Sequence, residues 1–587
     1  MINCLRVLGL LLLFSSQTIL ANDDDRLQEH LRYLSSDELM GRGNNRPEID
    51  VAAKYLAEEF RRYGLTPVGE DGSYFQHFSV KMGQKKGPEN SLTVGQTDTT
   101  FQLQEDRDYQ LLTFGSQDWI RGPLVFAGFG ITAPELNYDD YAALDVRGKI
   151  VLVFEHEPQE NSGNSPFGGK ELTHYGTVTY KVMNAKQRGA LAVMLLPDRF
   201  NHPRPEGSPP RSPETVANMG IPTVRLLDRW GRRLLEMSGR DLGEINLRLH
   251  TRLRPCSFEV EDVSVELGAD VVEIRRTLKN VLGFVRGQTD EVIVIGAHYD
   301  HLGLGDNASL ASDKIGEVHN GADDNASGVS GLLLLAEELS LMSPRRSLLF
   351  IAFAGEELGL LGSQFYTEHP AVPLAKTVAM VNLDMIGRSD GDVLIGGIGT
   401  ASVFRPILDD IEADYPLRFK YSQTPRGSSD HLSFASKRVP VLFFFSGLHR
   451  DYHKPTDDWE KINLVRTRQI IGVVRKLILR VDLLDQPPEY VDLRSDRLGS
   501  QQHPQFGFVP DTSWTLGGVR LGHVLEDTPA ERAGLMDGDV LVGFDGTEVN
   551  NLRSLRSLLE EKKSGDRVEV EVVRQGSMVH LTVQLRP

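Results

Sequence analysis

The feature that most constrains the fold is a series of short apolar segments between residues 256 and 486, separated by helical stretches. Four segments are expected to be strands (291–296, 347–353, 378–383 and 439–445), and three are expected to be helices (327–341, 357–368 and 464–484). Strands that are apolar at nearly every position are typical of a sheet covered by helices on both faces. The sequence therefore predicts an α/β fold with a mixed, mainly parallel central sheet flanked by helices.

Polar side chains that can bind metal follow these strands or precede the first of the helices. They are His298, Asp324, Glu357, Asp384 and His453, and Asp300, Glu356 and Tyr452 lie beside them in the sequence. In open parallel sheets, ligands collect beyond the carboxyl ends of the strands, so we expect these side chains to share one rim of the sheet.

The residue types in this set favour zinc. Imidazole nitrogen and carboxylate oxygen are both common zinc ligands, and three protein ligands per ion leave a position for water, as in catalytic sites. The carboxylates of Asp324, Glu357 and Asp384 carry a total charge of −3, which nearly balances the +4 charge of two zinc ions. Taken singly, a histidine after a strand is usually an ordinary loop residue, and paired acidic residues often begin helices. Their recurrence at successive strand ends favours the metal site.

Five motifs, in this order along the chain, resemble those of the co-catalytic zinc aminopeptidase family. They are His298-Tyr-Asp300, Asn320-Gly-Ala-Asp-Asp324, Gly355-Glu356-Glu357, Asn382-Leu-Asp384 and Tyr452-His453. The family includes aminopeptidases Y and S, glutamate carboxypeptidases and glutaminyl cyclases. The resemblance covers 256–486 and a helical lead-in at 22–118, and it implies the zinc exopeptidase fold for this part of the chain.

The resemblance also implies two zinc ions and a ligand for each position around them. Asp324 would bridge both ions, His298 and Asp384 would complete one site, and Glu357 and His453 would complete the other. A glutaminyl cyclase needs only one zinc ion, so the presence of both ligand sets favours a peptidase.

Three further residues receive roles from the same resemblance. Glu356 would be the general base, Asp300 would orient His298, and Tyr452 would donate to the tetrahedral oxyanion. Adjacent residues on a helix point about 100° apart. A helix beginning at Glu357 would therefore let this residue bind metal while Glu356 faces the attacking water.

The neighbouring polar residues are expected to have lesser roles. His301 and His319 flank the motifs and are predicted to be loop residues or to support the ligands. Ser429-Asp430-His431 are contiguous in sequence, which does not allow the hydrogen-bond geometry of a catalytic triad.

The predicted activity is removal of N-terminal residues from peptides by a zinc-dependent aminopeptidase. A carboxypeptidase of the same family is an alternative, because Arg388, Arg426 and Arg450 lie near the motifs and could bind a substrate carboxylate. A non-catalytic binding or scaffold protein is a second alternative. All predicted ligands and the general base are present, which favours an enzyme.

Two other parts of the chain resemble accessory domains. Residues 119–255 resemble a protease-associated domain, which would cover the cleft or limit substrate size. Residues 503–587 resemble a PDZ domain, with 506–509 as the carboxylate-binding loop. Such domains bind extended C-terminal peptides by strand addition. A PDZ-shaped packing module without a ligand remains the alternative.

The first 21 residues resemble a cleaved secretory signal, with Arg6 before an apolar run that is too short to span a bilayer. We therefore expect an exported protein, periplasmic or secreted, without stable membrane insertion. Cleavage would leave Cys256 as the one cysteine, which excludes an intrachain disulfide. The formal net charge of −18 argues against nucleic acid or anionic lipid as the main partner.

Overall fold

The computed structural model describes residues 26–493, apart from 170–172, 203–218, 306–307, 312–313 and 426, and most of residues 506–585. Within this part the chain divides into two compact units. One contains the residues up to 80 and 276–499, and the other contains 81–275 and the residues from 500 onward. The predicted signal segment, 1–21, lies outside the described residues.

The first unit is built on a nine-stranded sheet. Its strands are β1 (Thr66–Pro67), β2 (Phe75–Lys86), β13 (Val271–Val285), β14 (Val292–His298), β15 (Ser347–Phe353), β16 (Thr377–Leu383), β17 (Asp392–Gly396), β18 (Arg418–Tyr421) and β19 (Val441–Phe445). Their order is β1-β13-β15-β14-β16-β19-β17-β18, with β2 also pairing with β13. The central strands β15, β14, β16 and β19 are parallel, and antiparallel pairs flank them. The predicted mixed, mainly parallel sheet is confirmed.

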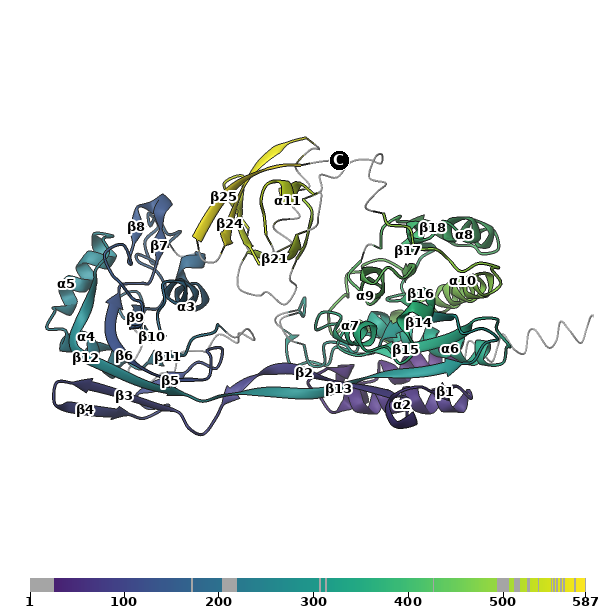
Figure 1. Cartoon of the computed structure of the whole chain (residues 1–587), viewed down its shortest axis with the longest axis horizontal. Helices are drawn as coiled ribbons and strands as arrows, with labels where there is room; N and C mark the ends of the chain where they lie inside the picture. The colour runs from purple at the N-terminus through teal and green to yellow at the C-terminus, as the bar shows by residue number, and fades with distance from the viewer. Residues whose placement is uncertain are drawn as a thin grey trace, which may run out of the picture. The chain divides into compact units, whose positions relative to one another are not determined.

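Helices cover this sheet in two groups (Figure 1). One group comprises α2 (Glu48–Arg62), α6 (Gly328–Ser340), α8 (Phe404–Glu412) and α10 (Leu464–Asp482), and the other comprises α7 (Leu361–Glu368) and α9 (His431–Ser436). The centre of the sheet is apolar on both faces, since every residue of β14, β15 and β16 is buried. This burial explains why these strands could be recognised as continuous apolar runs.

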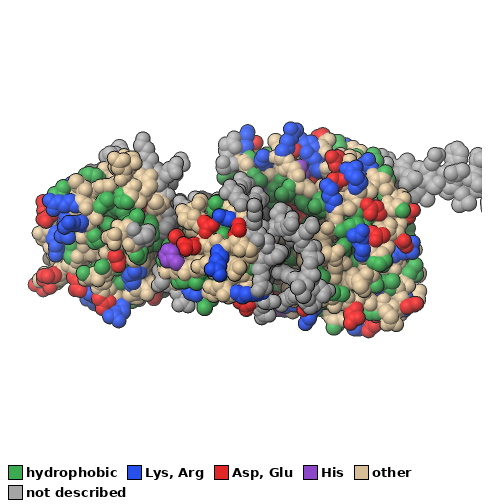
Figure 2. Space-filling view, turned by 90° about the horizontal axis from the view of Figure 1, so that it is seen from above, with side chains coloured by type: hydrophobic (Ala, Val, Ile, Leu, Met, Phe, Trp, Pro, Cys, Tyr) green, Lys and Arg blue, Asp and Glu red, His purple; other side chains and the backbone are tan. Residues whose placement is uncertain are grey.

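The surface of this unit carries charges of both signs. Exposed ion pairs include Arg405 with Asp409 and Lys476 with Asp414. Lys and Arg side chains are mixed with Asp and Glu side chains over the face of this unit that Figure 2 shows. Among the described helices, none has both the length and the apolar character needed to cross a membrane.

The second unit begins with an eight-stranded sheet of order β4-β3-β12-β6-β9-β10-β11-β5. Its strands are β3 (Ser91–Gln96), β4 (Thr99–Leu103), β5 (Tyr109–Leu111), β6 (Asp118–Ala127), β9 (Ile150–Phe154), β10 (Ala192–Leu196), β11 (Thr223–Leu226) and β12 (Ser257–Ala269). The sheet therefore extends beyond the limits 119–255 expected from the sequence, because β3 and β6 both pair with β12. Helix α3 (Val178–Gln187) lies between β9 and β10 in the chain.

The chain enters and leaves this sheet region through two paired strands, β2 and β13. Near one end of the pair, the Leu282 amide donates to the Tyr74 carbonyl at 2.7 Å. Near the other end, the Gly87 amide donates to the Asp270 carbonyl at 2.8 Å. The beginning and end of the inserted segment are thus adjacent in the structure.

The C-terminal residues form a six-stranded sheet. Its strands are β20 (Phe508–Pro510), β21 (Val519–Val524), β22 (Val540–Phe544), β23 (Thr547–Glu548), β24 (Arg567–Arg574) and β25 (Ser577–Gln584), with helix α11 (Pro529–Arg532). Its core includes Phe506 and Leu555, and Leu552 and Leu559 pack against that core. These leucines recur at a spacing of three or four residues, which places them on one side of the segment.

Candidate metal centre

The five predicted metal ligands lie together at one rim of the first unit's sheet. His298 is the last residue of β14, Glu357 follows β15, and Asp384 follows β16. Because these strands are parallel neighbours, their carboxyl ends meet. Asp324 precedes α6, and His453 lies in the loop after β19, which is parallel to β16.

The Asp324 carboxylate lies between two groups of side chains. Its Oδ1 is 3.4 Å from Nε2 of His298, and its Oδ2 is 3.2 Å from Nε2 of His453. On the first side, His298 Nε2 is also 3.3 Å from Asp384 Oδ1. On the second, His453 Nε2 is also 3.3 Å from Glu357 Oε2. Each oxygen of one buried carboxylate therefore faces a different histidine and a different acidic partner.

His301 contacts the centre directly, which fits the supporting position that the sequence allows for it. Its ring is buried, with Nδ1 2.7 Å from Glu357 Oε1 and 3.8 Å from Asp324 Oδ2. In the sequence, the one sign that His301 lies near the centre is its position directly after Asp300. His319 behaves as expected, because its ring nitrogens lie 2.8 Å from Ser309 Oγ and 3.0 Å from the Glu317 carbonyl.

The turn that holds Glu356 and Glu357 differs from the helix expected there. Helix α7 begins only at Leu361, because Gly359 and Leu360 have positive φ angles of 104° and 63°. Instead of helical bonds, the amides of Glu356 and Glu357 donate to the two Asp300 carboxylate oxygens at 3.2 and 3.3 Å. The two glutamates are therefore oriented by Asp300, and the helical argument for their directions is wrong.

Asp300 is positioned beside His298 but is mainly engaged elsewhere. Its Oδ1 is 3.8 Å from His298 Nδ1, whereas its main-chain oxygen is 3.2 Å from the same nitrogen. Asn44 donates to Asp300 Oδ2 at 2.6 Å, in addition to the amides of the glutamate turn. In this structure Asp300 fixes the turn through its side chain and contacts His298 most closely through its main chain.

The acidic groups strongly perturb one another. Burial by itself would lower the pKa of His298, but Glu356, Asp384 and Asp324 raise it well above its ordinary value. Burial raises the pKa of Glu356 well above its usual range, and Glu357 and Asp384 add to this rise. A concentration of buried negative charge of this kind requires protons or cations for compensation.

Tyr452 is half-buried next to the centre, with its ring stacked on His453 at a centroid distance of 3.9 Å. Burial raises the pKa of its hydroxyl, and Asp324 and Glu357 raise it further. The phenol therefore keeps its proton at neutral pH and can act as a hydrogen-bond donor.

Arg42 supports the loops around the centre, although no motif in the sequence marks it. Its side chain is fully buried and donates to the carbonyls of Tyr299 at 2.8 Å, Asn320 at 2.7 Å and Gly321 at 3.0 Å, as well as to that of Leu34. Burial lowers the pKa of Arg42 to about 10, and nearby acidic groups oppose this fall. It therefore stays charged at neutral pH.

Asp457 provides a second unpredicted support. Its Oδ2 accepts hydrogen bonds from the amides of Asp323 at 2.9 Å and Asp324 at 3.1 Å. Asp323 in turn accepts from the Gly387 amide at 2.6 Å and lies 3.2 Å from His449. Asp324 is thus held in place by the bond of its own amide and by the contacts of its neighbour Asp323.

These donor atoms fit transition-metal ions. In one group, ligand atoms of His298, Glu356 and Asp384 lie within 4.8 Å of one another, and in a second group those of His301, Asp324 and Glu357 do so. Imidazole and carboxylate groups suit zinc, and buried excess acid provides the charge that would hold a cation.

Comparison with known proteins assigns the part of the chain that carries this rim to a known domain type. Residues 280–478 match the model of Peptidase family M28. The chain contains a Peptidase family M28 domain. Residues 120–233 match a PA domain and residues 496–585 match a PDZ domain, as the resemblances in the sequence predict. With this peptidase domain and aminopeptidase relatives, the chain is a zinc metallopeptidase.

The relatives differ in how much of the chain they match. Aminopeptidase YwaD of Bacillus subtilis (strain 168) is 25% identical over 382 residues, which are 62% of this chain and 70% of the relative. The probable leucine aminopeptidase 2 of Aspergillus oryzae is 28% identical over 206 residues, 32% of this chain and 38% of the relative. Among solved structures, the aminopeptidase from Aneurinibacillus sp. strain AM-1 has a TM-score of 0.42 at 23% identity, covering 80% of this chain and 95% of that one.

Proposed function

We propose that this metallopeptidase is an exported dinuclear zinc aminopeptidase in which Glu356 is the general base. The observation that carries the proposal is the Asp324 carboxylate, whose two oxygens face two separate sets of imidazole and carboxylate groups. His298 and Asp384 would hold one ion, and Glu357 and His453 the other. A bound zinc pair would polarise the scissile carbonyl and lower the pKa of bound water.

His453 is preferred to His301 as the ligand of the second ion. Its Nε2 lies near both Asp324 and Glu357, and its Nδ1 is 3.0 Å from the Ala308 carbonyl. A zinc-bound imidazole commonly uses its other nitrogen in this way, which fixes the tautomer and the ring orientation. His301, with Nδ1 at Glu357 Oε1, would orient that carboxylate and leave Oε2 for the ion.

Glu356 has the position and the environment of a proton carrier. Its Oε2 is 3.9 Å from His298 Nε2, and its raised pKa favours uptake of a proton. It would take the proton of the attacking water and pass it to the leaving amine. Tyr452, protonated and next to His453, would donate to the oxyanion that forms at the scissile carbonyl.

The choice of aminopeptidase over carboxypeptidase rests on the arginines. The Arg388 guanidinium lies 2.9 Å from Asp451 and 3.6 Å from Asp457, so its charge is already compensated. Arg450 is exposed, and Arg426 lies outside the described residues. The acidic side chains of the centre suit the cationic α-amine of a peptide better than a carboxylate.

The decisive experiment is the Glu356→Gln variant of the purified chain. We expect hydrolysis of an aminoacyl p-nitroanilide to fall by about 10²–10⁴-fold, the usual range for loss of a general base, with unchanged metal content. Glu58→Gln, an exposed glutamate paired with Lys54 on α2, is the matched control. Loss of metal together with activity would instead make Glu356 a ligand. Preferred cleavage of N-blocked peptides at their C-terminus would favour the carboxypeptidase.

Export and the accessory domains complete the proposal. The apolar segment at the N-terminus supports secretion or transfer to the periplasm, which cell fractionation would test. The PA domain would restrict access of large substrates, and the PDZ domain would bind the free C-terminus of an extended peptide.

A further inference from the structure

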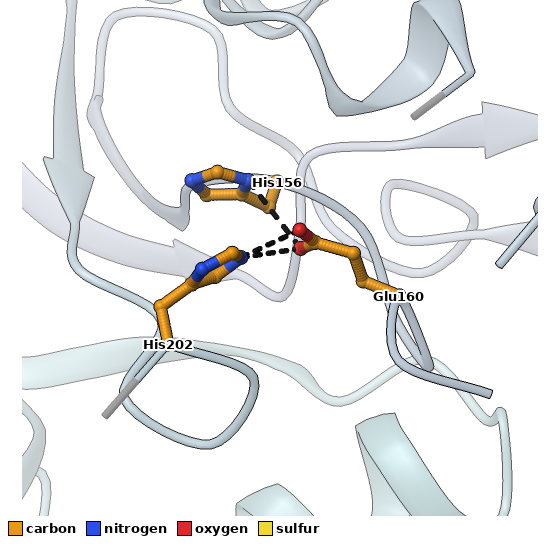
Figure 3. A group of neighbouring side chains, drawn as sticks. All are labelled: His156, Glu160 and His202. Atoms are coloured by element: carbon orange, nitrogen blue, oxygen red, sulfur yellow. Dashed lines mark hydrogen bonds and ion pairs between the residues drawn. The ribbon is translucent and has the colours of Figure 1, made fainter. Parts of the chain in front are cut away.

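A second cluster of metal-binding side chains lies in the PA region, outside the peptidase unit. It consists of His156, Glu160 and His202 (Figure 3). β9 and β10 are parallel neighbours, with Phe154 opposite Leu196 at their carboxyl ends. His156 and Glu160 follow β9, and His202 follows β10. The cluster thus occupies the carboxyl rim of its own sheet.

Both imidazoles face one carboxylate. His156 Nδ1 is 3.3 Å from Glu160 Oε2, and His202 Nε2 is 2.6 Å from the Glu160 carboxylate. The two rings are close together but tilted, with centroids 4.1 Å apart and an interplanar angle of 33°. Each of the three residues offers one ligand atom, and these three atoms all lie within 4.8 Å of one another. Figure 3 shows the three side chains pointing toward a common space.

The two loops that carry these residues are tied together by hydrogen bonds. The Asn201 side chain donates to the Glu157 carbonyl at 3.2 Å, and the Asn161 side chain donates to the Asn201 carbonyl at 2.8 Å. The His202 amide donates to the Asp198 carbonyl at 3.0 Å. These bonds involve residues next to the three side chains and fix the loops independently of them. The cluster is therefore held in a defined place before any ion binds.

Charge and accessibility favour a cation at this position. The Glu160 side chain is 10% exposed, whereas those of His156 and His202 are 31% and 30% exposed, so an ion has access from the imidazole side. Two protonated imidazoles at 4.1 Å would repel each other. With both rings neutral, a divalent cation can bind both nitrogens and the carboxylate together. The nearby acid Glu155 is already paired with Arg225 at 2.6 Å and does not compete.

We propose that His156, Glu160 and His202 bind one divalent transition-metal ion, with zinc favoured by the two nitrogen ligands and one oxygen ligand. The site is mononuclear, because a single carboxylate serves both histidines. Three protein ligands leave a fourth position for water or for another group. The ion would cross-link the loops after β9 and β10, and its binding energy would stabilise the PA fold. This site is separate from the peptidase centre and does not depend on its proposed mechanism.

The test measures zinc per chain in the full-length protein after chelation and reloading with zinc. The double variant His156→Gln/His202→Gln should hold about one zinc ion fewer than the parent, as expected for loss of two of three ligands. The control is His77→Gln, which removes an exposed histidine 2.8 Å from Glu70. This pair offers one imidazole and one carboxylate, in place of the two imidazoles of the cluster. The control variant should therefore bind as many zinc ions as the parent. Aminoacyl hydrolysis should be unchanged in both variants.

A second measurement separates this site from the peptidase centre. His298→Gln/His453→Gln should lose peptidase metal and retain the PA ion, seen as an anomalous peak at the zinc edge between His156 and His202. An unchanged zinc count in His156→Gln/His202→Gln would overturn the proposal. If that variant does not fold, absence of the anomalous peak in zinc-loaded parent crystals overturns it.

Discussion

Replacing Arg42 with methionine tests whether the centre depends on a residue that is far from every motif in sequence but bonded to two of them in the fold. The side chain donates to four main-chain carbonyls, three of them in the segments that carry Asp300 and Asp324. A typical hydrogen bond contributes about 1 kcal/mol net, and those of charged donors contribute more. Arg42→Met should therefore lower the free energy of unfolding of the peptidase unit by about 4 kcal/mol. It also removes a positive charge close to Asp324 and Glu357.

Arg42→Lys separates the two effects. Lysine keeps the charge, but its single ammonium group does not reach carbonyls that lie in different directions. We expect Arg42→Met to lose most peptidase activity and to release zinc at lower chelator concentration, with Arg42→Lys between it and the parent. Arg62→Met, on the exposed surface of α2, is the matched control.

The assay is chemical unfolding followed with and without metal, together with kcat/KM on an aminoacyl substrate. The metal-free measurement isolates the hydrogen bonds, and the difference between the two curves reports metal binding. Stability of Arg42→Met within about 1 kcal/mol of the parent would refute the reasoning, because that is the contribution of a single bond. If Arg42→Met released zinc at the same chelator concentration as the parent, the expected link between Arg42 and metal binding would be refuted.

Two further predictions concern the same unit. Burial lowers the pKa of His30 to about 3, assisted by Arg26 and Arg62, so the unfolded chain binds a proton first and stability is lost as the pH falls from about 6.5 toward 3. The parent should lose about 3 kcal/mol more unfolding free energy between pH 7 and pH 4 than the His30→Gln variant does. Thermal unfolding measured at both pH values checks this, and an equal loss of stability in the two proteins would contradict it. A Cβ on Gly362 would lie 2.3 Å from the Ala354 carbonyl, so Gly362→Ala should cost about 2 kcal/mol and reduce kcat. Gly163→Ala, with open space around it, is the control, and equal melting temperatures for the two variants would argue against the clash.

The sequence predicted the sheet and its rim because both depend on local signals. Apolar runs such as 347–353 mark buried strands, and a histidine or acid directly after such a run lies at the carboxyl end. Parallel pairing then brings distant residues such as His298 and Asp384 together without any further information. This is why the predicted ligand set converges in the structure.

The supports of the centre could not be predicted in this way. Arg42 and Asp457 act through main-chain groups of segments 278 and 134 residues away, and nothing near them in sequence marks that role. The turn at Glu356 is set by the side chain of Asp300 and by the left-handed residues before α7, which outweigh local helix propensity. The limits of the PA sheet likewise depend on strand pairing, which is not visible in composition.

The pairing of β2 with β13 has a consequence for how this chain folds. Since the first and last residues of the insertion lie side by side, the peptidase sheet can close without waiting for the nearly two hundred residues between them. Loop-closure entropy grows only with the logarithm of loop length, so exchanging this segment for a shorter one would change that cost by little. The architecture therefore permits the accessory module to be gained, lost or replaced while the hydrolytic rim stays intact.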